Sequence, residues 1–196
     1  MRPLQRGTPA PLDHLNDMAA PVAEAVFLTC CGSRRWASRM TAQRPYRDVA
    51  DLLTAGDAAC HDMSESDLDE ALTAEARGPR PPLPDRSPPR PGAQAAHTAL
   101  RAGHADYENR FGHPFVLCLD GLPAQERLDC TLTAIHRRLG HDRHTERGCA
   151  AEELRLLARG RLARLAGSVP GRVPGLRPRF APYDPPSPRA VPAPGG

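Results

Sequence analysis

Residues 107–118 read Y-E-N-R-F-G-H-P-F-V-L-C, and this stretch decides how the rest of the chain is interpreted. Tyr107 and Phe111 are four residues apart, so both fall on one face of a helix and can be buried together. Gly112 can adopt the positive φ that closes a helix, and Pro114 prevents the helix from resuming. The apolar residues that follow are expected to cross the interior as an irregular segment.

Helical periodicity extends over most of the chain on either side of this stretch. Apolar residues recur every three or four positions, which predicts amphipathic helices, and strand patterns are nearly absent. The expected inner faces are Val22, Val26 and Cys30; Trp36 and Met40; Tyr46, Val49, Leu52 and Leu53; Leu68, Ala71 and Leu72; Ala96, Leu100 and Tyr107; Leu128, Leu132, Ile135 and Leu139; and Leu154, Ala158, Leu162 and Leu165.

Several residues mark where these helices begin and end. Gly32 can end the first helix, and Ser33 can cap the next one. Pro45 is suited to the first turn of a third helix. Ser64 followed by Asp67 resembles a capping box, with Asp where Glu or Gln is usual.

The helices predict one all-α, bundle-like domain over residues 11–166. Residues 1–10 are expected to be flexible. Seven prolines fall within residues 79–91, so 79–92 is predicted to be a surface loop. Residues 167–196 contain nine prolines and five glycines, which is typical of a disordered tail.

The composition disfavours a nucleic-acid-binding or membrane protein. The chain has 26 arginines and no lysine, but 23 acidic residues are interleaved with them, so the net charge is only +3. One tryptophan, three tyrosines and four phenylalanines offer few rings for stacking on bases. No apolar run reaches membrane-spanning length. We therefore expect a cytoplasmic protein that binds neither nucleic acid nor a membrane.

The metal-binding residue types form no clear site in the sequence. The six cysteines lie in apolar patterns without a C-x-x-C pair, which indicates free thiols. His141 and His144 have a spacing that would allow a shared metal, but no third ligand is evident nearby. We interpret them as part of a solvated helix cap and expect no metal.

Further blocks occur in order around the central stretch, and together they make the chain resemble a known family. The chain is similar, over roughly residues 12–165, to the 2-oxo-4-hydroxy-4-carboxy-5-ureidoimidazoline (OHCU) decarboxylases. The blocks are L-D-H-L-N (12–16), F-L-T-C-C-G-S-R-R-W-A (27–37), R-P-Y (44–46), R-R-L-G-H-D-R-H-T-E-R (137–147) and A-E-E-L-R-L-L-A-R-G-R-L-A-R-L (151–165).

The resemblance implies an all-α, commonly dimeric protein of the urate-to-allantoin route that needs no cofactor or metal. Family members decarboxylate OHCU, a small ureidoimidazoline, and yield (S)-allantoin. Main-chain groups of the apolar segment help to hold the ring, which by resemblance assigns Phe115, Val116 and Leu117 to substrate binding.

The family's acid–base residues are a histidine in an H-P-[RD]-[IL]-G-like motif and a glutamate in an S-x-x-E-Q-like motif. Here Glu75 stands at the histidine position, Ala93 at the glutamate position and Gln94 at the glutamine position. A carboxylate is mostly ionised near neutrality, so it accepts a proton but does not readily donate one. Two hypotheses remain: an OHCU decarboxylase with altered or weak chemistry, and a catalytically degenerate member that acts as a binding or interaction protein.

Overall fold

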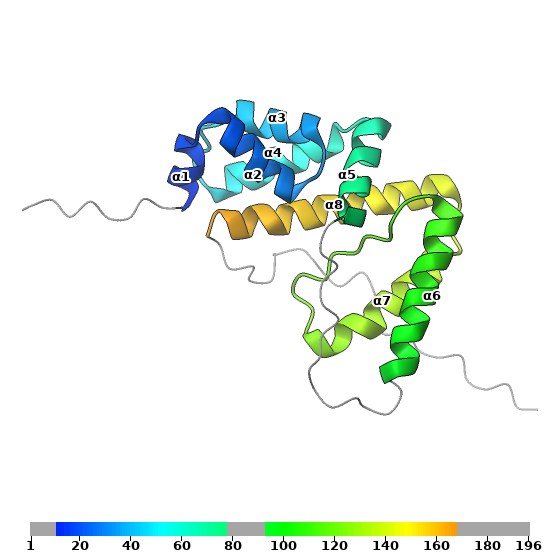
Figure 1. Ribbon diagram of the computed structural model, residues 1–196. Helices are drawn as coiled ribbons and strands as arrows, with labels where there is room; N and C mark the ends of the chain where they lie inside the picture. The colour runs from blue at the N-terminus through cyan, green and yellow to red at the C-terminus, as the bar shows by residue number, and fades with distance from the viewer. Residues whose placement is uncertain (1–10, 78–92, 168–196) are drawn as a thin grey trace, which may run out of the picture.

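The computed structural model describes residues 11–77 and 93–167 (Figure 1). These residues form eight helices and no strand, which confirms the all-α prediction. The predicted flexible start, the proline-rich insert and residues 168–196 of the predicted tail lie outside the described residues. The helices are α1 (Pro11–Asp17), α2 (Ala20–Cys30), α3 (Arg34–Ala42), α4 (Val49–His61), α5 (Glu65–Arg77), α6 (Ala93–Phe111), α7 (Ala124–Arg138) and α8 (Arg143–Leu165).

The longest helix, α8, runs through the middle of the molecule. Helices α1 to α5 lie on one side of it, and α6 and α7 form a hairpin on the other (Figure 1). Helix α8 packs on α4 and α2, while α6 packs on α7. None of the described helices combines the length and the apolar character needed to cross a membrane. The segment between α6 and α7 returns along α8, so α8 connects the two sides.

The apolar core lies mainly between α8 and helices α1 to α5. Phe27, Trp36 and Tyr46 pack edge to face within it, with ring centroids 6.2–6.5 Å apart. Other buried members include Leu15, Ala23, Cys31, Met40, Leu52, Leu72, Leu154, Ala158 and Leu162. This arrangement confirms the inner face that the sequence predicts for α8 up to Leu162.

The predicted inner face of α2 is wrong at one position. Val22 is 54% exposed, whereas Ala23 and Phe27 have no exposed surface. The larger Phe27 sits four residues after Ala23, so these two share a face, and Val22 is turned about 100° away from Ala23. Burial of the aromatic ring therefore decides which side of α2 faces the core.

Two predicted helix starts are confirmed and one is wrong. Ser33 Oγ accepts from Trp36 N, and Ser64 and Asp67 bond to each other's main-chain N–H groups. Pro45 does not open a helix, because α4 begins at Val49 with Asp48 as its N-cap. Asp48 caps through its side-chain oxygen, which proline cannot do.

Two glycines, Gly32 and Gly56, allow neighbouring helices to approach closely because they carry no side chain. Gly32 does not serve as a left-handed cap; instead, a Cβ there would lie only 2.1 Å from Ala74 Cβ of α5. A Cβ at Gly56 of α4 would lie 2.6 Å from Leu162 Cδ1 of α8. Absence of a side chain at Gly32 thus lets the α2–α3 turn contact α5 directly.

We expect Gly32→Ala to destabilise the protein by about 1–3 kcal/mol, because Ala74 Cβ is fixed to its backbone and cannot rotate away. Gly148→Ala is the matched control, since a Cβ at that position in α8 meets nothing within 4 Å. Replacing a helical glycine at such a site should stabilise by about 0.5–1 kcal/mol. Urea unfolding measures both; equal stabilities for the two variants would contradict the close contact.

Candidate functional site

The apolar segment after α6 forms one wall of the candidate site. Gly112 has φ +78° and its N–H donates to Glu108 O, so it ends α6 as the sequence predicts. Tyr107 has no exposed surface and Phe111 is 8% exposed, which confirms their burial. The Phe115 ring lies edge-on to Tyr107 at 5.0 Å between centroids. The segment therefore folds back onto the helix that precedes it.

Arg138, the last residue of α7, fixes this wall from the other side. Its Nη1 donates to Val116 O at 2.7 Å, and its guanidinium carbon lies 4.6 Å from the centroid of the Phe115 ring. Its Nε donates to Glu146 Oε1 at 2.8 Å. One buried cation thus binds the main chain and covers an aromatic ring of the wall.

Glu146 in the first turns of α8 balances that charge. It is completely buried, and its Oε1 accepts from both Tyr107 Oη and Arg138. Burial raises the pKa of Tyr107, and its hydrogen bond to Glu146 raises it further. Burial lowers the pKa of Arg138, but the bond to Glu146 and the electrostatic effects of nearby Tyr107, Glu146 and Glu153 together outweigh burial, so the pKa is raised overall. Arg138 therefore stays charged, and Tyr107 keeps its proton.

Beyond Val116 the segment follows α8 along its length. Cys118 N donates to Glu153 Oε2 at 2.8 Å, and Asp120 pairs with Arg164 at 3.0 Å. A Cβ at Gly160 would lie 1.9 Å from Asp120 Oδ2, so the approach uses the missing side chain. Leu117 lies between the anchors at Val116 and Cys118 and is partly buried.

Glu75, near the end of α5, is bound through both carboxylate oxygens by Arg161 of α8. Arg161 Nη1 donates to Oε1 at 2.5 Å and Nη2 donates to Oε2 at 2.8 Å. Arg161 Nη1 also donates to Cys30 O at 3.1 Å. The bond to Glu75 raises the pKa of Arg161, although burial opposes this effect. The two parallel hydrogen bonds from Nη1 and Nη2 are the bidentate geometry in which arginine binds carboxylates most strongly.

Helix α5 is held on α8 near its other end as well. Arg147 of α8 pairs with Asp69 at 2.8 Å and donates to Glu65 O at 2.9 Å. Together with the Glu75–Arg161 pair, these bonds fix α5 against α8 at two points. The position of Glu75 is therefore set by the packing of the whole helix.

The structure places Ala93 and Gln94 away from this region. They open α6 at the end of the α6–α7 hairpin that is remote from α8 (Figure 1). Gln94 is exposed, and at 1.5 Å rise per residue it lies about 20 Å along α6 from Tyr107. Gln94 is thus not brought together with Glu75 or with Phe115.

The structure places Glu75 and the wall at different points along α8, beside Arg161 and Glu146 respectively, and adds residues that sequence reasoning missed. Phe115 and Val116 lie in the wall that Arg138 fixes, and Glu75 lies on the side of α8 that carries Arg161. Arg161 was missed because it carries no motif of its own. Arg138 stands three residues after Ile135, on the inner face of α7, and this spacing was the available signal.

The comparisons with known proteins agree with this architecture. The family model for OHCU decarboxylase matches residues 16–79 and 88–163. A curated 2-oxo-4-hydroxy-4-carboxy-5-ureidoimidazoline decarboxylase from Amia calva is 35% identical over 113 residues. That match covers 53% of this chain and 55% of the relative, so the chain spans about half the length of the curated relative.

Two solved structures share the fold. A crystal structure of (S)-allantoin synthase has a TM-score of 0.60 at 18% identity, covering 80% of this chain and 54% of that one. A crystal structure of OHCU decarboxylase in the presence of (S)-allantoin has a TM-score of 0.57 at 23% identity, covering 72% and 97%. At these identities the likeness shows the fold alone. Because the family model matches residues 16–79 and 88–163, which are most of its length, the chain belongs to the OHCU decarboxylase family.

Proposed function

We propose that the protein is an OHCU decarboxylase-like enzyme of the urate-to-(S)-allantoin route, with a rate lowered by its altered acid–base position. The observation that carries this proposal is the fixed main chain of the wall, where Arg138 donates to Val116 O, on a scaffold that the OHCU decarboxylase family model matches. As the resemblance implies, we expect a cytoplasmic homodimer that needs no cofactor.

The reaction requires the protein to orient the substrate and to transfer a proton. Loss of CO₂ leaves an electron pair that can delocalise into the ring of OHCU and is then quenched by a proton. Holding the ring so that the breaking bond is aligned lowers the barrier without any covalent step. A wall with a fixed main chain suits this task, because Arg138 and Glu153 hold Val116 and Cys118 on either side of Leu117.

Glu75 limits the delivery of the proton that follows loss of CO₂. Arg161 binds both oxygens of Glu75, and an ionised carboxylate accepts a proton but does not readily deliver one. Loss of a positioned acid–base group costs about 100- to 10,000-fold in rate. We therefore expect orientation to survive and proton delivery to be slow.

A second candidate function is a catalytically degenerate family member that acts as a binding or interaction protein. The specific observation in its favour is that Glu75 already engages both Nη atoms of Arg161. Gln94, at the family's glutamine position, is also exposed at the remote end of α6. In that case the scaffold would be retained without turnover.

The two functions are separated by generating OHCU in situ from urate and following the decay of its optical activity. We expect the purified protein to accelerate this decay above the spontaneous rate, in proportion to protein concentration. A decay rate unchanged by the protein would rule out the enzyme and leave the degenerate member.

If the decay is accelerated, Glu75→Ala should abolish the acceleration, because the only proton acceptor proposed at this position is removed. Glu70→Ala is the matched control on the same helix, where it removes an exposed pair with Arg34. Circular dichroism should show both variants folded. Activity retained in Glu75→Ala would exclude Glu75 from the mechanism.

A further inference from the structure

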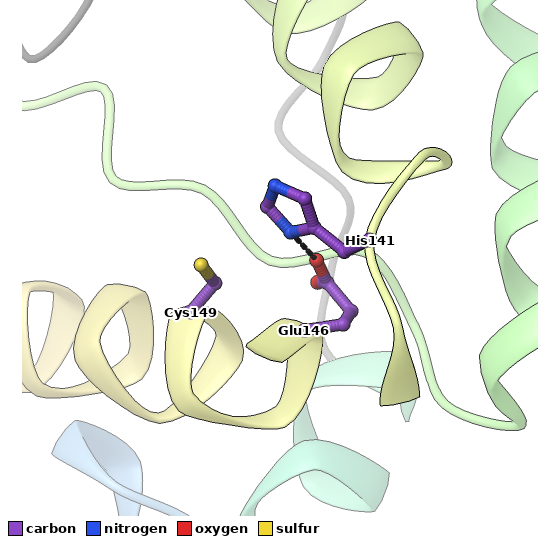
Figure 2. A group of neighbouring side chains, drawn as sticks. All are labelled: His141, Glu146 and Cys149. Atoms are coloured by element: carbon purple, nitrogen blue, oxygen red, sulfur yellow. Dashed lines mark hydrogen bonds and ion pairs between the residues drawn. The ribbon is translucent and has the colours of Figure 1, made fainter. Parts of the chain in front are cut away.

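The turn between α7 and α8 brings together three side chains that have no part in the proposed reaction. They are His141, Glu146 and Cys149, and Figure 2 shows His141 against Glu146 with the Cys149 sulfur on the same side of α8. We propose that they form a binding site for a first-row divalent metal ion of the Zn²⁺ type. A nitrogen, an oxygen and a sulfur ligand form a donor set that Zn²⁺ accepts.

The backbone places these ligands without distortion. Glu146 and Cys149 are three residues apart on α8, so their side chains leave the helix on the same face. His141 directly precedes Asp142, which caps α8 through Thr145 N at 2.9 Å. This cap fixes the turn that carries His141, so all three ligands lie on the α7–α8 turn and the first two turns of α8.

The distances are close to those of a tetrahedral site. His141 Nδ1 lies 2.9 Å from Glu146 Oε2, and all three ligand atoms lie within 4.8 Å of one another. Zn²⁺ bonds of about 2.0–2.3 Å place neighbouring ligand atoms about 3.3–3.8 Å apart. Small side-chain rotations therefore suffice to admit an ion, and a water molecule would complete the tetrahedron.

The two carboxylate oxygens of Glu146 have different partners. Its Oε1 is bonded to Tyr107 and Arg138, whereas its Oε2 faces His141. Hydrogen bonds to one oxygen of a carboxylate orient the other oxygen for a metal, as is usual behind metal ligands. The buried ion pair would therefore remain intact when the ion binds through Oε2.

Charge and access also permit a cation. Arg138 balances Glu146, and a Cys149 thiolate would add a further negative charge that faces the ion. The side chain of His141 is 20% exposed, which leaves a route from solvent to the ligands. His144, which the sequence pairs with His141, is exposed and outside the cluster. The additional ligands were missed because they lie further along α8.

Co²⁺ titration of the chelator-treated full chain tests this site. We expect saturation at one ion per chain, with a thiolate-to-cobalt charge-transfer band that Zn²⁺ abolishes by displacement. Changes beside a metal ligand weaken binding by about 10- to 100-fold, so Cys149→Ala and His141→Asn should each weaken it by at least about 100-fold. Cys149→Ala should also remove the band.

Cys130→Ala and His144→Ala are the matched controls, since they remove a partly buried thiol and an exposed imidazole outside the cluster. Both should keep the band and the affinity. Absence of saturable binding in the unmodified chain would overturn the site. So would a charge-transfer band that survives in Cys149→Ala, or an affinity that is unchanged in His141→Asn.

Discussion

Arg138 and Glu146 form an ion pair that is almost completely withdrawn from water, with 2% and 0% of their side chains exposed. Burial of two charges is costly, and only additional hydrogen bonds to their remaining polar atoms make it tolerable. Here those bonds come from Tyr107, Val116 and His141. Because removal of one partner from such a pair costs about 3–5 kcal/mol, the junction of α6, α7 and α8 depends on both.

The same pair connects the fold to the candidate site. Without Arg138, the Val116 carbonyl and the Phe115 ring would lose the group that fixes them, and the segment after α6 would have no defined course at this point. Three arginines of α8 act in a similar way toward the opposite side of that helix. Arg155 and Arg159 both bind Asp57 of α4, and Arg161 binds Glu75 of α5. Helix α8 thus holds α4, α5 and the segment after α6 by charge as well as by apolar contact.

Local sequence signals predicted much of this fold. The end of α6 at Gly112 and the caps at Ser33 and Ser64 depend only on nearby residues, so they were readable. The exposure of Val22 was not readable, because tertiary contacts decide which side of α2 faces the core. The start of α4 was missed because Pro45 and Asp48 both suit a first turn, and only tertiary contacts decide between them.

The site was less predictable than the fold for the same reason. Phe115 and Val116 could be placed from their motif, but the bonds from Arg138 to Val116, from Tyr107 to Glu146 and from Arg161 to Glu75 join residues 22, 39 and 86 positions apart. Pairings of charges over such separations leave no periodic pattern in one sequence. The resemblance predicts that Glu75 stands at the family's histidine position, whereas its pairing with Arg161 depends on how α5 packs on α8.

The central claim is that Glu75 limits a scaffold that otherwise still orients its substrate. Glu75→His restores to that position a group that both accepts and donates a proton near neutrality. The most direct measurement compares kcat/KM for OHCU decay between this variant and the unmodified chain. The account predicts an increase of at least about 100-fold, the lower end of what a positioned acid–base group supplies. An unchanged or lower kcat/KM in a folded Glu75→His protein would contradict it.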